Sequence, residues 1–224
     1  MCFSASASFI AGAALTATGA ATLRMTLRKA EIPFAAIPLL FGIQQILEGL
    51  IWLSFRNASP LPNAVLTFAY SLFSHVLWPM FVPFAVSGLE RVPWRRRAVA
   101  ACQLAGVAVG LYLLYFLINF PVTSRVLGNH IVYESPHFYI ISVMVLYLLG
   151  TCVSGLLSSD RIIQWFGAAT FVTFVAAYLI HAATLVSVWC FFAAVLSFIV
   201  YIYFRRNRAP GYRHLTPRSS NAHP

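Results

Sequence analysis

Charged residues are scarce in this chain. Only 9% of its 224 residues are Asp, Glu, Lys or Arg, whereas average soluble domains contain about 25%. Five acidic and fifteen basic side chains cannot cover the surface of a water-soluble domain of this size, which argues against a soluble globular protein. Disorder is excluded, because 60% of the residues are hydrophobic and 15% are aromatic. The composition therefore indicates an integral membrane protein.

Cysteine pairs with metal-binding spacing are missing as well. The four cysteines, Cys2, Cys102, Cys152 and Cys190, lie far apart and form no Cys-x-x-Cys motif. This spacing indicates neither a zinc knuckle nor a disulfide framework.

Seven stretches are apolar and long enough to cross a bilayer, which takes about 20 residues as a helix. They cover Phe3–Leu23, Pro33–Leu53, Ala64–Val86, Ala98–Ile118, His137–Leu157, Ile163–Ala183 and Val186–Phe204. The last two form one run that is too long for a single helix, so we expect a tight hairpin near Thr184–Ser187. The predicted fold class is all-α, a polytopic bundle of seven transmembrane helices. Residues 1–204 would form this domain, and residues 205–224 a basic, disordered cytoplasmic tail.

The basic residues predict how the bundle is oriented. Positive residues resist translocation and gather in cytoplasmic loops. With the N-terminus outside, the inner loops and the tail hold thirteen basic residues, and the outer loops hold two, Arg56 and Arg125. Six or eight spans would break this alternation. The expected topology is N-out and C-in, with one long outer loop over Asn119–Pro136.

Glu48 is the only acidic residue inside a predicted span. An ionisable side chain costs about 2.5–3.5 kcal/mol at the middle of a membrane helix and usually faces the bundle interior. Gln44, Glu48 and Trp52 are spaced i, i+4, i+8 and share one stripe of the second helix, with Gln45 beside it. Such a polar seam can be hydrogen-bonding glue between helices or part of a site, and both interpretations stay open.

Other polar side chains lie on the same side of the predicted bundle, although at different depths. They are Ser71 and His75 near Trp78 in the third span, His137 at the start of the fifth, Tyr178 and His181 at the end of the sixth, Cys190 in the seventh, and Cys2. In the predicted topology His75 lies near the midplane and the others lie in the outer half or at outer ends, so all of them can reach an outward-facing cavity, and the cytoplasmic half is nearly featureless apart from Cys102 and Cys152. This segregation favours an outward-facing pocket. Pro79 and Pro83 should kink the third helix on the cytoplasmic side of His75.

The residue types in this pocket predict its chemistry. Two histidines and a carboxylate, with a thiolate nearby, suit zinc, iron or copper better than calcium or magnesium. We predict that His75, His181, Glu48 and Cys2 hold one transition-metal ion, and that Glu48 and Ser71 are catalytic. Gln44, Gln45, Trp52, Trp78, Tyr178, His137 and Cys190 would line the pocket.

Three functions are compatible with such a pocket. The first is a metal-dependent hydrolase of a lipid or small amphiphile that enters from the outer leaflet. The second is a proton or metal-ion transporter or a membrane sensor, and the third is a structural partner of another membrane protein. A transporter should continue its polar path to the cytoplasmic face, where few polar groups occur. The lipid bilayer is the expected partner, and nucleic acid is not expected.

Two segments resemble a known family. The opening Met1–Ser8 (MCFSASAS) and the segment Pro33–Gly49 (PFAAIPLLFGIQQILEG) are similar to an uncharacterised family of small bacterial integral membrane proteins, which have an MCFSA-like start and a PLLFGIQQ-like second helix. The resemblance implies a multi-pass protein of the bacterial inner membrane and no particular activity.

A second resemblance is to the alkaline-ceramidase-like superfamily of seven-helix metal hydrolases. Ser71 and His75 match its Ser-x3-His pair. Of its terminal His-x3-His pair this chain has only His181, with Leu185 at the second position. The resemblance implies a zinc hydrolase in which Glu48 or Cys2 replaces the missing ligand.

Overall fold

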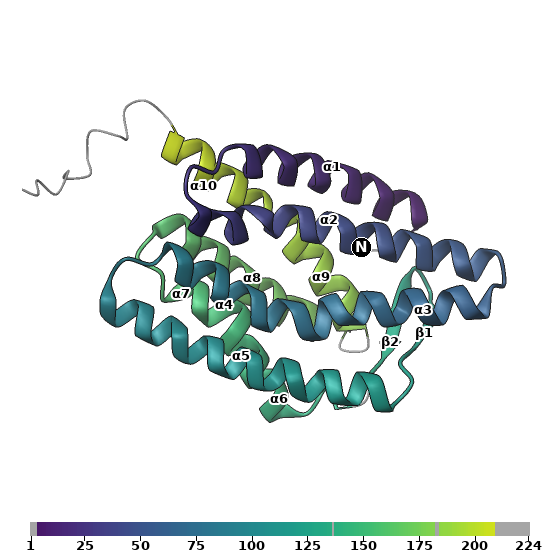
Figure 1. Cartoon of the computed structure of the whole chain (residues 1–224). Coiled ribbons are helices and arrows are strands. Elements are labelled where there is room, and N and C mark those ends of the chain that lie inside the picture. The colour runs from purple at the N-terminus through teal and green to yellow at the C-terminus, as the bar shows by residue number, and fades with distance from the viewer. Residues whose placement is uncertain (1–3, 136, 182–183, 209–224) are drawn as a thin grey trace, which may run out of the picture.

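The computed structural model describes residues 4–135, 137–181 and 184–208, which form a bundle of antiparallel helices with a small β-hairpin at one end (Figure 1). Six of the described helical segments are long and apolar enough to cross a membrane: Ala5–Arg24, Lys29–Arg56, Pro60–Leu89, Pro93–Asn119, Arg161–Leu179 and Leu185–Arg208. A seventh segment, Ile141–Leu156, is apolar but shorter. The predicted all-α bundle is confirmed.

Several spans are built from more than one helical element. In chain order the elements are α1 (Ala5–Arg24), η1 (Lys29–Glu31), α2 (Ile32–Arg56), α3 (Pro60–Ser71), η2 (Leu72–Leu77), α4 (Trp78–Leu89), α5 (Pro93–Asn119), β1 (Thr123–Leu127), β2 (His130–Glu134), α6 (Ile141–Leu148), η3 (Leu149–Val153), α7 (Ser154–Leu156), α8 (Arg161–His181), α9 (Leu185–Leu196) and α10 (Phe198–Arg208). Thr184, the first residue of the expected hairpin, lies between α8 and α9, whereas Leu185–Ser187 already belong to α9. The last span continues to Arg208, past the predicted boundary at residue 204.

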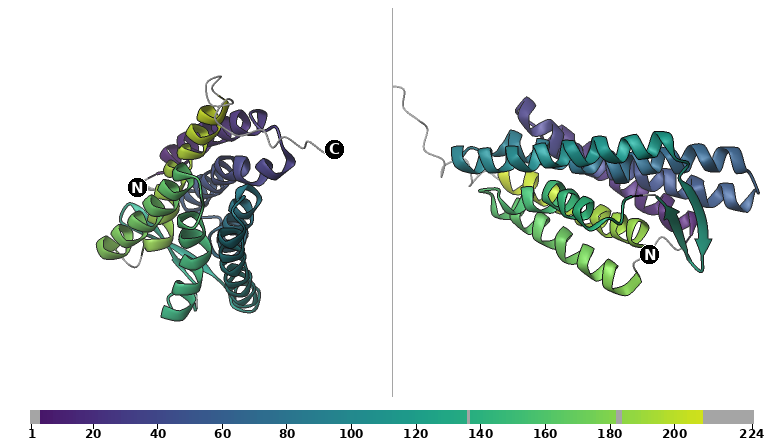
Figure 2. Two further views of the ribbon diagram at one scale, coloured as in Figure 1. Left: turned by 90° about the vertical axis from the view of Figure 1, so that its left-hand side faces the viewer. Right: turned by 90° about the horizontal axis from the view of Figure 1, so that it is seen from below.

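Successive spans run in opposite directions, so the loops alternate between two ends of the bundle (Figures 1 and 2). At one end, Arg208 of α10 forms an ion pair with Glu31 of η1, and Arg95 of α5 donates to the carbonyl of Ser158 before α8. We call this the basic end. The opposite end holds β1 and β2 and is called the hairpin end. The structure therefore gathers the basic loops on one side, as an N-out, C-in topology requires.

This topology predicts the result of a reporter experiment. A reporter that is active only in the periplasm should give no signal when it is fused after Arg208, and a cytoplasmic reporter should be active there. The periplasmic reporter should be active when it is inserted at Gly128, in the turn between β1 and β2. The opposite pattern would overturn both the orientation and the helix count.

The hairpin was not foreseen, because residues 119–136 were expected to form a long loop. β1 and β2 pair antiparallel through a two-residue turn in which Gly128 has a φ of 59°. Tyr133 of β2 stacks on Tyr70 of α3 with ring centroids 4.4 Å apart, and Ile131 is fully buried. The hairpin therefore closes the interior of the bundle at this end.

The third span changes its winding where the prolines lie. Residues Leu72–Leu77 form a π-helix, in which the N–H of Trp78 donates to the carbonyl of Phe73, five residues back. The following residue, Pro79, has no N–H, so the carbonyl of Ser74 lacks the corresponding helical donor. The hydroxyl of Tyr147 in α6 donates to this carbonyl instead. The proline thus couples the third span to the fifth through a freed backbone oxygen.

Pro83 has a similar effect one turn later, because it cannot donate to the carbonyl of Pro79. That carbonyl lies against glycines of two neighbouring spans. A Cβ atom at Gly106 of α5 would stand 1.9 Å from the carbonyl oxygen, and one at Gly150 of η3 would stand 2.6 Å from it. Three spans therefore meet here at backbone contact.

The interior falls into two apolar clusters. The one toward the basic end includes Phe34, Ile37, Val82, Ile163 and Phe204. The one toward the hairpin end includes Cys190 and is richer in aromatic residues with polar groups, such as Tyr70, Tyr133, Tyr147 and Trp189. The polar residues of α2 lie where the two clusters meet: Gln44 accepts from Trp78 of the first cluster, and Glu48 interacts with Cys190 of the second.

Glu90 connects two loops at the basic end. One of its carboxylate oxygens accepts from the N–H of Val92 at 2.8 Å, and the other accepts from the N–H of Ser159 at 2.6 Å. Burial by itself would raise the pKa of Glu90, but these N–H donors outweigh it and hold the pKa below its ordinary value. The α4–α5 turn is thereby fixed to the segment that precedes α8.

Candidate functional site

Glu48 is the centre of a group of polar residues that includes Gln45, Ser187 and Cys190 and is called the Glu48 cluster. Its side chain is fully buried about two-thirds of the way along α2. One carboxyl oxygen lies 2.7 Å from the donor hydroxyl of Ser187 in α9, and the other accepts from the amide of Gln45 at 3.4 Å. Both donors are neutral. Because no lysine or arginine occurs inside the predicted spans, a positive charge beside Glu48 must come from a histidine, a proton or a metal ion.

The predicted stripe on α2 faces the interior at Gln44 and Glu48. Gln44 is fully buried, and its amide oxygen accepts from the indole N–H of Trp78 at 2.7 Å. The Trp78 ring stacks on Phe41 with centroids 3.8 Å apart. Trp52 is only partly buried, and its indole N–H has no partner among the described residues. These contacts fasten the stripe to the third span.

His75 is buried within the π-helical turn of that span. Its Nδ1 lies 2.7 Å from the hydroxyl of Ser74, which in turn donates to the carbonyl of Ser71 at 3.5 Å. In the tautomer with the proton on Nδ1, Ser74 accepts from Nδ1–H and Nε2 keeps its lone pair. Neither Nε2 of His75 nor the hydroxyl of Ser71 has a partner among the described residues. A buried polar atom without a partner is costly and suggests a ligand or a water molecule.

Cys190 brings α9 into the cluster one turn after Ser187. It is buried and lies close enough to Glu48 to interact with it electrostatically. It also borders a small cavity of about 20 Å³, together with Tyr147, Thr151 and Trp189. This volume holds about one water molecule.

Two predicted pocket residues lie away from this cluster. His137 is exposed, with a φ of 68°, and stacks on Phe116 with centroids 3.7 Å apart. It was expected inside the fifth helix, but α6 begins only at Ile141, so His137 belongs to the preceding loop. Tyr178 is 46% exposed on the outer side of α8.

The predicted metal ligands are only partly described. Cys2 lies outside the described residues, and so does the side chain of His181, whose backbone ends α8. Within the described part of the chain, no three His, Cys, Asp or Glu side chains come together as a metal-binding group. His75 lies against Ser74 and Phe138, with the His75 and Phe138 ring centroids 4.5 Å apart, and a metal site that combines it with Glu48 would need His181 or Cys2 as a further ligand.

Sequence reasoning missed several members of the cluster. Ser187 was interpreted as part of a turn, although it lies on the same helical face as Cys190, three residues later. Tyr147 sits in the middle of an apolar span, where its hydroxyl must find a partner. That signal was available, but the partner, a carbonyl freed by Pro79, depends on the π-helical winding and could not be predicted.

A family of unknown function (DUF6629) matches residues 1–215 of the chain. The chain belongs to this family. The polar cluster lies within the part that matches DUF6629, and membership agrees with the similarity of the opening segment and of the second helix to an uncharacterised family. No curated protein and no solved structure matches the chain.

Proposed function

We propose that this member of DUF6629 is a multi-pass protein of the bacterial inner membrane, and that its Glu48 cluster is an intramembrane site for one cation. The observation that supports this proposal is a fully buried carboxyl group that receives hydrogen bonds from the neutral donors Ser187 and Gln45. Burying an ionised carboxylate without a compensating charge costs several kcal/mol. The carboxyl group therefore carries a proton or adjoins a cation. Only a bound cation would give the site a chemical function.

The cation that suits these residues best is zinc, iron or copper. Nε2 of His75 offers a lone pair, and Ser74 fixes the opposite nitrogen, which is the usual arrangement for a metal-binding histidine. Glu48 would add an oxygen ligand, and His181 or Cys2 would complete the set. A metal held this way, with one open position, activates water for hydrolysis. Glu48 and Ser71 would then be placed for catalysis, as in the ceramidase-like superfamily.

An apolar groove supports a lipid or small amphiphile as the substrate. It lies between α6 and α8, has a volume of about 510 Å³, and is lined by Tyr139, Met144, Phe174 and Tyr178 among others. The ring of Phe174 is 5.1 Å from Trp189, which borders the small cavity beside Cys190. An acyl chain could therefore approach the cluster from the membrane through this side.

The packing of the other half favours a one-sided site over a transport pathway. Between the cluster and the basic end the bundle is filled by the apolar residues around Phe34, Val82 and Phe204. A proton or metal-ion pathway would need polar groups through this region. We therefore prefer the hydrolase to the transporter.

Elemental analysis of the purified protein tests the proposal. We expect about one zinc, iron or copper ion per chain after purification in detergent without a chelator. A chelator should then lower the melting temperature by roughly 5–10 °C, if the metal was present at about 100 times its dissociation constant. A folded protein with no transition metal above background would overturn the metal site and leave Glu48 as a protonated structural group.

A further inference from the structure

A second, larger cavity opens at the basic end of the bundle, away from the Glu48 cluster. Its volume is about 420 Å³, within the range of about 300–1,000 Å³ that is usual for ligand pockets. Arginines from three separate segments line it: Arg28 before η1, Arg91 between α4 and α5, and Arg208 at the end of α10. Leu27, Leu89 and Ile163 supply an apolar part of the wall. The cavity therefore combines positive charge with apolar surface.

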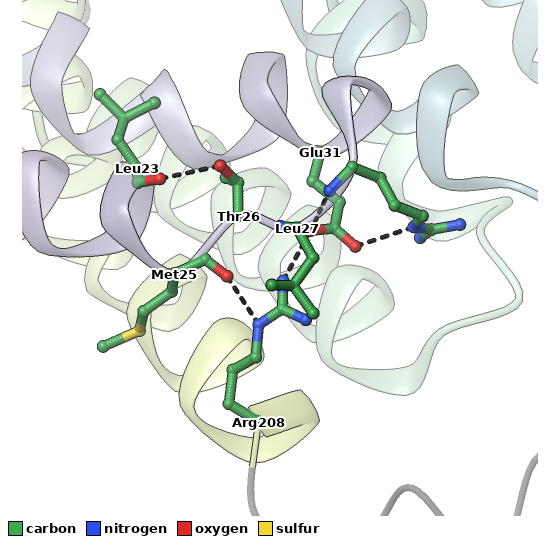
Figure 3. A network of polar contacts seen from close by, with 7 residues as sticks. Leu23, Met25, Thr26, Leu27, Glu31 and Arg208 are labelled. Atoms are coloured by element: carbon green, nitrogen blue, oxygen red, sulfur yellow. Dashed lines mark hydrogen bonds and ion pairs between the residues drawn. The ribbon is translucent and has the colours of Figure 1, made fainter.

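The two acidic residues of this cavity are already engaged. Glu31 accepts from Nε of Arg28 at 3.0 Å, from Arg208 at 2.7 Å and from the N–H of Leu27 at 2.9 Å (Figure 3). Asp160 accepts from the N–H of Ile162 at 2.8 Å and so caps the start of α8. These bonds hold the loops in place, and neither carboxylate is directed to Arg91.

The side chain of Arg91, unlike those of the two acidic residues, is not engaged in the described part of the chain. It is exposed and forms no ion pair with any of the described residues. With three arginines against Glu31 and Asp160, the lining carries a formal charge of +1. The nearest further acid, Glu90, uses both oxygens to accept from backbone N–H groups. The cavity thus presents a guanidinium group that forms no ion pair with a described acid.

We propose that this cavity binds a phosphate-bearing anion, with Arg91 as the main charged contact and Arg28 and Arg208 as flanking donors. A guanidinium group matches two phosphate oxygens with two parallel N–H bonds, and Arg208 is already oriented by its bonds to Glu31 and to the carbonyl of Met25. The cavity lies at the ends of the predicted spans, at the level of the lipid headgroups. The phosphate comes either from an anionic lipid of the cytoplasmic leaflet or from a soluble phosphate compound.

Two binding measurements on the detergent-purified full chain separate these sources. Native mass spectrometry measures binding of phosphatidylglycerol, with phosphatidylcholine as the neutral comparison. Calorimetry measures binding of inorganic pyrophosphate. Each is repeated with Arg91→Gln and with Arg97→Gln, a matched loss of one exposed arginine at the same end but outside the cavity lining.

We expect Arg91→Gln to weaken binding about tenfold and Arg97→Gln to leave it nearly unchanged, because loss of one charge-assisted hydrogen bond costs about 1.4 kcal/mol or more. Preference for phosphatidylglycerol alone identifies a lipid headgroup, and binding of pyrophosphate identifies a soluble ligand. The proposal is overturned if neither probe binds, or if the two substitutions weaken binding equally, since that result indicates only general attraction to a basic surface.

Discussion

Replacing Gly106 by alanine is expected to destabilise the bundle by about 3 kcal/mol or more. The new Cβ atom would lie 1.9 Å from the carbonyl oxygen of Pro79, far inside van der Waals contact. Overpacking typically costs about 1–3 kcal/mol when flexible side chains can move aside. Here the obstacle is the backbone of α4, and the facing Gly150 of η3 leaves no space behind it. The third, fourth and fifth spans would have to separate.

The measurement is the melting temperature of the purified protein, together with its yield in the membrane fraction. Ala108→Val serves as the control, because Ala108 is exposed on the same helix and the added methyl groups meet lipid. We expect Gly106→Ala to melt well below the wild type or to fail to accumulate, and Ala108→Val to resemble the wild type. Equal stability of the two variants would mean that α5 does not approach Pro79 this closely.

The helical framework could be predicted because the membrane imposes it. The thickness of a bilayer fixes the length of an apolar span, and the exclusion of basic residues from translocated loops fixes the alternation of loops. Neither signal depends on how helices contact one another. For this reason the run from Ile163 to Phe204 is expected to form two spans although few polar residues interrupt it, and α9 begins at Leu185, inside the segment expected to turn.

The hairpin was missed for a different reason. Residues 119–136 are polar or turn-forming and lie between two apolar spans, which predicts a loop. The two-residue turn at Gly128 and Asn129, between the apolar pairs Val126–Leu127 and Ile131–Val132, is a short-range hairpin signal. Gly128 has the positive φ that such a turn needs at its first central position. The local sequence therefore contains the information for the hairpin, which apolar span length does not reveal.

The polar cluster was only half predictable. Helical spacing places Gln44 and Glu48 on one face, and the cost of burying them requires that this face meet other helices. Helical spacing cannot predict that Ser187 is the partner of Glu48, because the two residues are 139 positions apart in the chain. It also fails across Leu72–Leu77, where π-helical winding changes the angle between successive side chains. Ser71 and His75 are both buried, but the extra residue in this turn could not be predicted from α-helical spacing.

Replacement of Glu48 by glutamine should remove the bound metal and preserve the fold. The amide has the same shape as the carboxyl and can still accept a hydrogen bond from Ser187, so a structural role would survive the change. A role in metal binding would not survive the change, because the neutral amide oxygen is a much weaker ligand than a carboxylate. Loss of a supporting outer-shell contact already costs about 10- to 100-fold in metal affinity, so we expect a loss of about 100-fold or more.

The most direct test is the number of transition-metal ions per chain in wild type, Glu48→Gln and Glu134→Gln, purified in parallel. Glu134→Gln makes the same chemical change at an exposed residue of β2 and controls for handling. The account predicts about one metal ion per chain in the wild type and in Glu134→Gln, and almost none in a folded Glu48→Gln protein. An equal metal content in wild type and Glu48→Gln would contradict it, because Glu48 would then be hydrogen-bonding glue between α2 and α9.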